Sequence, residues 1–190
     1  ARAGPNTQRD NLDGATLLPG FIDAHLHWRW TSDNMHTVNV YEVKSRQAAL
    51  DAVAERVAQV QPGEWVRGHG WAQDFWEGRA FPTAADLDAV APDNPVYLTA
   101  KSAHAAWVNT AALQRAGITA DTPNPDGGEI SHGADGQPTG ILLENPAMRL
   151  VADCIPKLTT EQIADQMLVA QRKALSEGLT AIHDLDDPDC

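Results

Sequence analysis

The chain has 190 residues, of which 43% are hydrophobic and 21% are charged, a composition typical of a soluble globular protein with one well-buried domain. Its formal net charge of −12 argues against nucleic acids and anionic membranes as partners, because their phosphates would be repelled. No apolar run approaches the roughly 20 residues that a membrane-spanning helix needs.

Regular structure is predicted to begin after a polar lead-in over residues 1–16, so that the folded part covers residues 17–190. In chain order we expect a strand at 21–27, a helix at 45–60, a strand at 65–69, a helix at 83–90, a strand at 96–99, a helix at 105–116, a strand at 141–143, a helix from 146, a helix at 159–176 and a strand at 179–183. Ser45 is a favoured helix N-cap, and Thr159 with Gln162 has the spacing of a capping box.

The alternation of strands and helices predicts an α/β fold with a parallel sheet or barrel rather than a sandwich. Thr83 and Asp86 resemble a second capping arrangement, and Gly117 suits the position just beyond a helix end. Proline and glycine accumulate between residues 121 and 139. This segment is therefore predicted to be an irregular loop that could cover an active site.

Two histidines stand at the end of the first predicted strand, in the sequence LPGFIDAHLH at residues 18–27. Side chains alternate between the faces of a strand, so His25 and His27 point the same way, and Asp23 joins them. Two neutral imidazoles can hold one divalent ion, while a catalytic zinc site needs about three protein ligands and an open position for water. We predict His25 and His27 as metal ligands. Asp23 either orients one imidazole or is a plain polar strand residue.

The context of these histidines resembles a known family. PGFIDAHLH looks like the first barrel strand of the amidohydrolase superfamily of metal-dependent hydrolases. The segments GHGWAQDFW, PTAADLDAVAPDNPVYL, HAAWVNTAALQRAGI, GGEI and GQPTGILLE then follow in the order found in amidohydrolase family 3, the branch that resembles N-substituted formamide deformylases. The resemblance covers residues 17–184. It implies an N-terminal fragment of a (β/α)8 TIM barrel, which usually takes about 250 residues, with an inserted α+β segment at about 77–140.

The resemblance implies a hydrolase that cleaves a carbon–nitrogen bond of the non-peptide amide type in a small-molecule substrate. One or two divalent ions, zinc foremost, would activate a water molecule, and a carboxylate would move its proton. That general base is expected beyond Cys190, so the fragment alone should be inactive. A noncatalytic binding or structural module derived from the same fold is the alternative. The two cysteines show no disulfide framework, which fits a cytoplasmic location.

Glu144 and His104 are further candidates at the ends of predicted strands. A carboxylate that directly follows an apolar strand is costly to bury unless it is paired or metal-bound. By resemblance, Glu144 could bind metal or substrate, although it could also cap the helix that begins at Pro146. The family usually has Asp-Gly-His where this chain has Ser-Ala-His at residues 102–104. His104 therefore either contacts substrate or caps a helix, and Asn109 either faces the site or serves its own backbone.

Aromatic and acidic residues follow the second predicted strand in GHGWAQDFW. Trp71 and Asp74 are predicted to line a substrate pocket, because aromatic side chains at a barrel mouth suit an apolar substrate. Packing of the tryptophans in the core is the alternative. The glycines on both sides of His69 allow close approach of another backbone.

Overall fold

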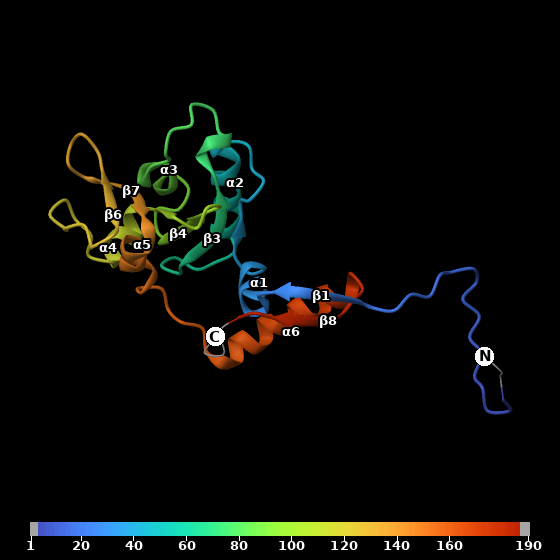
Figure 1. Cartoon of the computed structure of the whole chain (residues 1–190). Coiled ribbons are helices and arrows are strands. Elements are labelled where there is room, and N and C mark those ends of the chain that lie inside the picture. Colours follow the sequence, from blue (N-terminus) through green and yellow to red (C-terminus); the bar gives the residue numbers. More distant parts are fainter. Residues whose placement is uncertain (1–3, 187–190) are drawn as a thin grey trace.

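The computed structural model describes residues 4–186 and contains two open sheets (Figure 1). The strands are β1 (Phe21–Leu26), β2 (Val38–Asn39), β3 (Val66–Trp71), β4 (Val96–Ala100), β5 (Ala105–Val108), β6 (Glu129–His132), β7 (Pro138–Leu143) and β8 (Leu179–Asp184). The helices are α1 (Trp28–Asn34), α2 (Arg46–Val57), the 3-10 turn η1 (Gln73–Phe75), α3 (Ala84–Asp88), α4 (Thr110–Arg115), α5 (Glu144–Ala152) and α6 (Thr160–Ser176). None of the helices in the described residues is long and apolar enough to cross a membrane.

The smaller sheet joins the two ends of the folded chain. β1 and β8 run parallel, with Phe21 opposite Leu179 and Leu26 opposite Asp184, and α6 packs beside them (Figure 1). The apolar sequence of β1 predicts a buried strand, which is wrong for this structure, because Phe21 and Ile22 are 59% and 62% exposed. Parallel strands are normally covered on both faces, and this pair lacks that cover among the described residues.

The larger sheet has six strands in the order β2-β3-β4-β5-β7-β6. β2, β3 and β4 are parallel, whereas β5, β6 and β7 are joined to their neighbours in antiparallel pairs. The fold is therefore mixed α/β: the expected parallel pairing is present in β2, β3 and β4, and the second half of the sheet is antiparallel. The segment at about 77–140 that we predicted as inserted contains β4, β5, β6 and the beginning of β7.

At β5, in the middle of the six-stranded sheet, both faces are covered by apolar side chains. Trp107 faces the cluster that includes Leu50 and Val53 of α2, whereas Val108 faces the cluster that includes Leu113 of α4 and residues of α5. Consecutive strand residues point to opposite faces, so every residue of β5 is buried. The six-stranded sheet thus carries the main hydrophobic core.

The segment at residues 105–116, predicted as one helix, is a strand followed by a short helix. The change occurs at Asn109, whose buried side chain serves the backbone and not a site. Its Oδ1 accepts hydrogen bonds from the amides of Val96 and Ala112, and its Nδ2 donates to the carbonyls of Ala91 and Asn94. Asn109 therefore caps α4 and ties it to the start of β4.

One other prediction about local structure needs correction, and three are confirmed. The loop expected at 121–139 contains β6 and the beginning of β7, while α1 and β2 are elements for which no prediction was made. Ser45 accepts from the Ala48 amide at the start of α2. Both expected capping boxes are present, at the starts of α3 and α6. Short polar signals thus located helix starts reliably.

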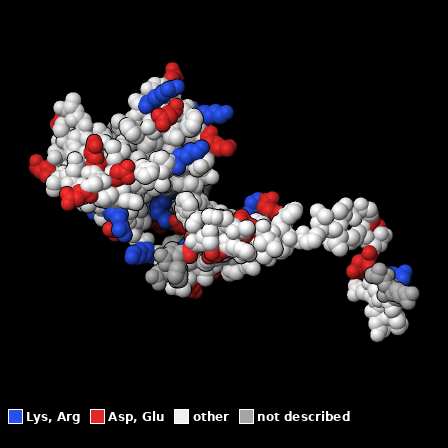
Figure 2. Space-filling model, viewed as in Figure 1, with Lys and Arg blue, Asp and Glu red and all other residues white. Residues whose placement is uncertain are grey.

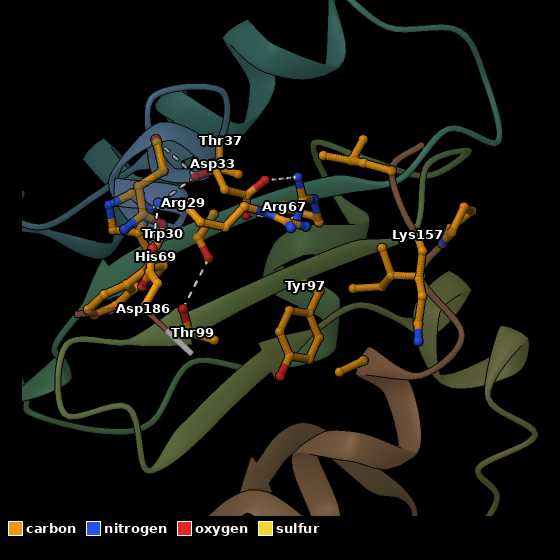
Figure 3. Close-up of a pocket in the computed structure, with 16 residues that line it drawn as sticks. Arg29, Trp30, Asp33, Thr37, Arg67, His69, Tyr97, Thr99, Lys157 and Asp186 are labelled. Atoms are coloured by element: carbon orange, nitrogen blue, oxygen red, sulfur yellow. Dashed lines mark hydrogen bonds and ion pairs between the residues drawn. The ribbon is translucent and has the colours of Figure 1, made fainter. Parts of the chain in front are cut away.

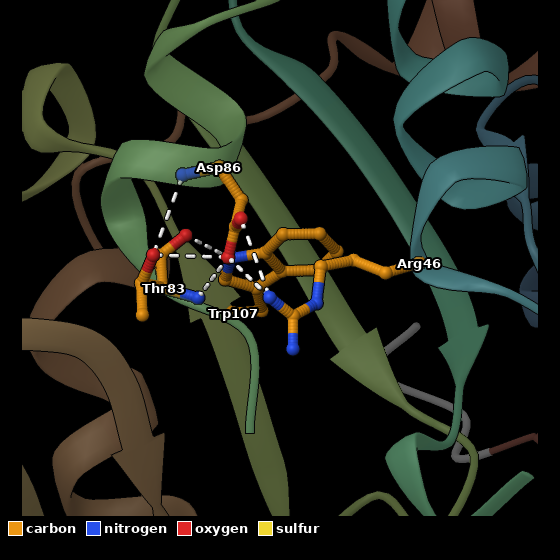
Figure 4. A network of polar contacts seen from close by, with 4 residues as sticks. All are labelled: Arg46, Thr83, Asp86 and Trp107. Carbon is orange, nitrogen blue, oxygen red and sulfur yellow. Dashed lines mark hydrogen bonds and ion pairs between the residues drawn. The ribbon is translucent and has the colours of Figure 1, made fainter. Parts of the chain in front are cut away.

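A polar network holds Trp107 in the core (Figure 4). The indole Nε1 of Trp107 donates to the Thr83 carbonyl at 2.8 Å, and Thr83 is the N-cap of α3. Asp86 accepts from the Thr83 amide at 2.7 Å, and Arg46 of α2 lies 3.4 Å from the same carboxylate. Trp107 also packs edge-on against Trp71 and Trp76. One indole therefore connects β5 to α3 and, through Asp86, to α2.

Candidate functional site

The histidine pair lies where β1 ends. The ring centroids of His25 and His27 are 5.6 Å apart and their planes are inclined by 68°. Two imidazoles bound to one tetrahedral ion would place their centroids about 5 Å apart, given zinc–nitrogen distances of about 2.0–2.1 Å. The separation of the two rings is thus close to the separation of two imidazoles on one ion.

Asp186 orients the second of these histidines. Its Oδ1 lies 3.1 Å from Nδ1 of His27, and its Oδ2 accepts from the Arg29 amide at 2.5 Å. A carboxylate that holds one ring nitrogen leaves the other, here Nε2, available to a metal ion. Asp23, the residue that we considered for this role, instead accepts a hydrogen bond from the His25 backbone amide.

The sequence analysis missed Asp186, although a signal exists. It follows β8, the strand that pairs with β1, and parallel neighbours bring their carboxyl ends together. Asp184, at the end of the same strand, accepts from the Trp28 amide at 3.0 Å, and this hydrogen bond lowers the pKa of its carboxyl. An acidic residue just beyond a strand that pairs with the histidine strand was thus the available clue.

Glu144 does not join the histidine pair. Among residues 4–186, no group of three or more His, Cys, Asp and Glu side chains is arranged to hold a metal ion. Glu144 stands at the end of β7 in the larger sheet, where its Oε2 lies 2.9 Å from Nδ1 of His104. Glu144 is also the first residue of α5, so its carboxylate lies in the first turn of that helix, where a negative charge is favourable, although its side chain bonds to His104.

Four of the six predicted site residues surround one small cavity of about 250 Å³. Trp71, Asp74, His104 and Glu144 all line it, and they come from three separate segments. His104 precedes the strand β5 and not a helix, so its alternative as a helix cap does not hold. Trp71 is fully buried and donates to the Leu98 carbonyl, so it belongs to the core while one part of it reaches the cavity.

The backbone beside this small cavity adopts an uncommon conformation. Ala103 and Glu144 have φ angles of 62° and 63°, in the left-handed region that non-glycine residues rarely occupy. The Glu144 amide donates to the His104 carbonyl at 2.9 Å, which holds the two segments together. Such conformations persist where the surrounding structure fixes them, and they gather at functional sites.

A larger cavity, of about 680 Å³, reaches Asp186, the hydrogen-bond partner of His27 (Figure 3). Asp186, which holds His27, is one of its lining residues, together with Arg29 and Trp30 of α1. The opposite wall is one face of the larger sheet. On this face, Arg67 of β3 lies opposite Tyr97 of β4, and His69 lies opposite Thr99. The two cavities share none of their described lining residues.

Charges inside the larger cavity are partly paired. Arg67 donates to both carboxylate oxygens of Asp33, at 2.7 and 3.0 Å, which joins β3 to α1. The hydroxyl oxygen of Thr37 lies 3.1 Å from Nδ1 of His69, within hydrogen-bond distance. Burial lowers the pKa of His69, although the negative charge of Asp33 opposes this shift. Burial also raises the pKa of Tyr97 to about 12, so its phenol stays protonated.

We expect His69 to make folding stability depend on pH. Because its pKa is lower in the folded chain than its ordinary value of 6.5, the unfolded chain binds more protons near that pH. The contribution of His69 is therefore fully present above pH 6.5 and decreases as the pH falls towards its lower folded pKa. Urea unfolding at pH 7.5 and 5.5 measures the free energy of unfolding at each pH. Between these two pH values, this free energy should decrease less for His69→Gln than for the native chain. Equal losses in the two proteins would contradict this expectation.

Comparison with known proteins is consistent with these features. The model of the amidohydrolase family matches residues 10–190. YtcJ of Bacillus subtilis (strain 168) is 36% identical over 182 residues, which are 96% of this chain and 34% of that protein. The N-substituted formamide deformylase of Arthrobacter pascens is 37% identical over 147 residues, which are 76% of this chain and 27% of that protein.

The fold has a solved counterpart as well. The crystal structure of an uncharacterized metal-dependent hydrolase from Pyrococcus furiosus matches with a TM-score of 0.60 and 25% identity, over 88% of this chain and 32% of that chain. The chain spans about a third of the length of the curated relatives that it matches. The order of motifs beginning at PGFIDAHLH and the match over residues 10–190 agree, and the chain belongs to the amidohydrolase family.

Proposed function

We propose that the chain is part of a metal-dependent hydrolase that cleaves a carbon–nitrogen bond of the non-peptide amide type. The observation that carries this proposal is the histidine pair: two rings 5.6 Å apart, one of them held through Nδ1 by Asp186. Membership of the amidohydrolase family and the likeness to a metal-dependent hydrolase support it. The substrate would be a small molecule that enters the cavity beside Asp186.

Within this proposal, His25 and His27 hold one divalent ion, with zinc as the first choice because neutral imidazoles are among its preferred ligands. When bound, such an ion would lower the pKa of a water molecule, so that hydroxide becomes available near neutral pH to attack a carbonyl carbon. Asp186 keeps His27 in the tautomer with its proton on Nδ1, so that Nε2 remains a ligand. The general base and the remaining metal ligands would come from outside the 190 residues, so this length alone should bind metal weakly and turn over little substrate.

The same proposal includes a barrel. β1 and β8 would be neighbouring strands of a (β/α)8 barrel, and the six-stranded sheet would be inserted between them. The support is their parallel pairing and the exposed apolar side chains of β1 and α6, such as Phe21, Ile22 and Leu168, which further strands and helices would cover. Trp71, Asp74 and His104, together with Glu144, would then contact part of the substrate at the smaller cavity. The role of Glu144 as a metal ligand remains a prediction that the described residues do not support.

Zinc titration of the chain, followed by NMR of the histidine rings, tests the metal site. We expect the ring signals of His25 and His27 to shift together in fast or intermediate exchange. The exposed His132 is the internal reference, since it stands at the end of β6 on the larger sheet. If His25 and His27 do not respond, or if His132 responds equally, the proposed metal site is wrong.

Hydrolysis separates the enzyme from the alternative, a noncatalytic binding or structural module. The natural protein that contains this chain should hydrolyse N-formyl or N-acyl amines, lose that activity with a chelator and regain it with zinc. Zinc binding without hydrolysis of any such amide would favour the module.

A further inference from the structure

The larger cavity is positively charged in a strongly acidic chain. The sequence contains 26 acidic residues against 14 Lys and Arg, yet the described residues that line this one cavity include three cationic side chains and two carboxylates. The cationic residues are Arg29, Arg67 and Lys157, and the carboxylates belong to Asp33 and Asp186. Figure 2 shows Lys and Arg side chains gathered in and beside the notch where the larger sheet meets the β1–β8 part of the molecule.

Both carboxylates of the cavity are already engaged. Asp33 binds Arg67 through two hydrogen bonds, and Asp186 holds the ring of His27 and the Arg29 amide. Within residues 4–186, Lys157 forms no ion pair. Lys157 lies in the linker between α5 and α6, and Figure 3 places it at the opposite end of the view from Arg29 and Asp186. A positive charge thus stands at the end of the cavity that is remote from the histidine pair.

The space between the two ends suits an uncharged, partly apolar segment. Tyr97 lies between them in Figure 3, and its phenol is a neutral hydrogen-bonding group. Ile155, Pro156 and Leu158 of the same linker add apolar surface. A volume of about 680 Å³ is within the range of small-molecule sites, roughly 300–1,000 Å³. The cavity therefore has a polar end at Asp186 and a cationic end at Lys157. Its middle combines apolar surface with the neutral phenol of Tyr97.

We propose that this cavity binds small organic carboxylates, with the carboxylate at Lys157 and the rest of the molecule extending along Tyr97 towards Asp186. This inference rests on the proposed function in one respect: it makes the substrate an N-acyl compound that carries a carboxylate, with its amide at the histidine end. A monoanion fits better than a phosphate dianion, because the lining residues leave only one positive charge in excess.

One acidic group near the cavity should repel a bound carboxylate. Its removal therefore tests whether the charge of the ligand determines binding. Asp153 does not line the cavity, but its charge contributes to the raised pKa of Tyr97 and so acts on the middle of the site. Removal of this charge in Asp153→Asn should strengthen carboxylate binding, whereas removal of the positive charge in Lys157→Ala should weaken it. A structural role of either residue would not produce opposite changes.

The experiment uses zinc-free chain and two matched probes, N-acetylleucine and its uncharged amide N-acetylleucinamide. Binding is followed at low salt by the NMR signals of the Trp30 indole and the Tyr97 ring, because both residues line the cavity. We expect N-acetylleucine to bind at least about tenfold more tightly than the amide, because a hydrogen bond between two charged groups is roughly twice as strong as one between neutral groups. Lys157→Ala should reduce this preference to within about twofold.

The matched control is Lys44→Ala, since Lys44 is also exposed and does not line the cavity. This variant should keep the full preference for the carboxylate. Equal binding of the two probes to the native chain, or an unchanged preference in Lys157→Ala, would overturn the inference. Because zinc is absent, these results are independent of the metal titration: a failed metal site with an intact carboxylate preference would refute the proposed function alone.

Discussion

Replacement of Trp107 by alanine is expected to destabilise the chain by about 3–5 kcal/mol, the usual cost of removing a buried aromatic side chain. Trp107 is fully buried, packs against Trp71 and Trp76, and donates its indole proton to the Thr83 carbonyl. Its loss would leave a cavity and also an unpaired carbonyl at the cap of α3. The measurement is the free energy of unfolding in urea, monitored by circular dichroism.

Two further variants separate the causes. Trp107→Phe retains most of the apolar contact but removes the donor, so its cost should be clearly smaller than that of alanine. Trp30→Ala is the matched control, because Trp30 is 61% exposed and its loss should change stability by no more than about 0.5 kcal/mol. A loss below about 1 kcal/mol for Trp107→Ala would show that the three indoles do not form the core that the structure describes.

The parts of this fold that depend on neighbouring residues were predictable. Ser45, Thr83 and Thr159 mark the beginnings of helices because each side chain accepts a hydrogen bond from an amide three residues later. The spacing of His25 and His27 predicts neighbouring rings for a similar reason, since it depends only on the period of a strand. In each case the cause acts over one turn or less.

The parts that depend on distant residues were missed, because a local sequence pattern does not determine which strands pair. The segment from Ala105 to Val108 could be the first turn of a helix, and it is a strand because β4 and β7 lie on either side of it. Asp186 reaches His27 across 159 positions, and His104 reaches Glu144 across 40. The exposed β1 shows the same limit, since its apolar sequence indicates burial, whereas Phe21 and Ile22 are exposed in the structure.

The polar face of the larger sheet shows why the larger cavity was not predicted either. Arg67 and His69 alternate with the buried Val66 and Gly68, which is an ordinary pattern for a strand with one wet face. Only the pairing of β3 with β4 and the ion pair to Asp33 turn that face into the wall of a cavity beside the histidines. Binding sites formed between elements therefore need the tertiary structure.

The second large effect is expected at the histidine pair. His27→Ala removes one of the two proposed metal ligands, so zinc affinity should fall to the level of nonspecific binding to single histidines. Asp186→Asn preserves the shape of the side chain but removes its charge beside Nδ1 of His27. Loss of such a carboxylate partner usually costs about 10–100-fold in metal affinity, and we expect a decrease in this range. Competition with a chromophoric zinc chelator measures both values.

His132→Ala is the control for this series, because it removes an exposed histidine from the larger sheet and should leave zinc affinity unchanged. The relative zinc affinities of the three variants decide the interpretation. If Asp186→Asn binds zinc as tightly as the native chain while His27→Ala does not, the ion binds His27 without support from Asp186, and the ring must be oriented by β1 alone. If both retain native affinity, zinc binds elsewhere, and the 5.6 Å spacing of the two rings has no role in metal binding.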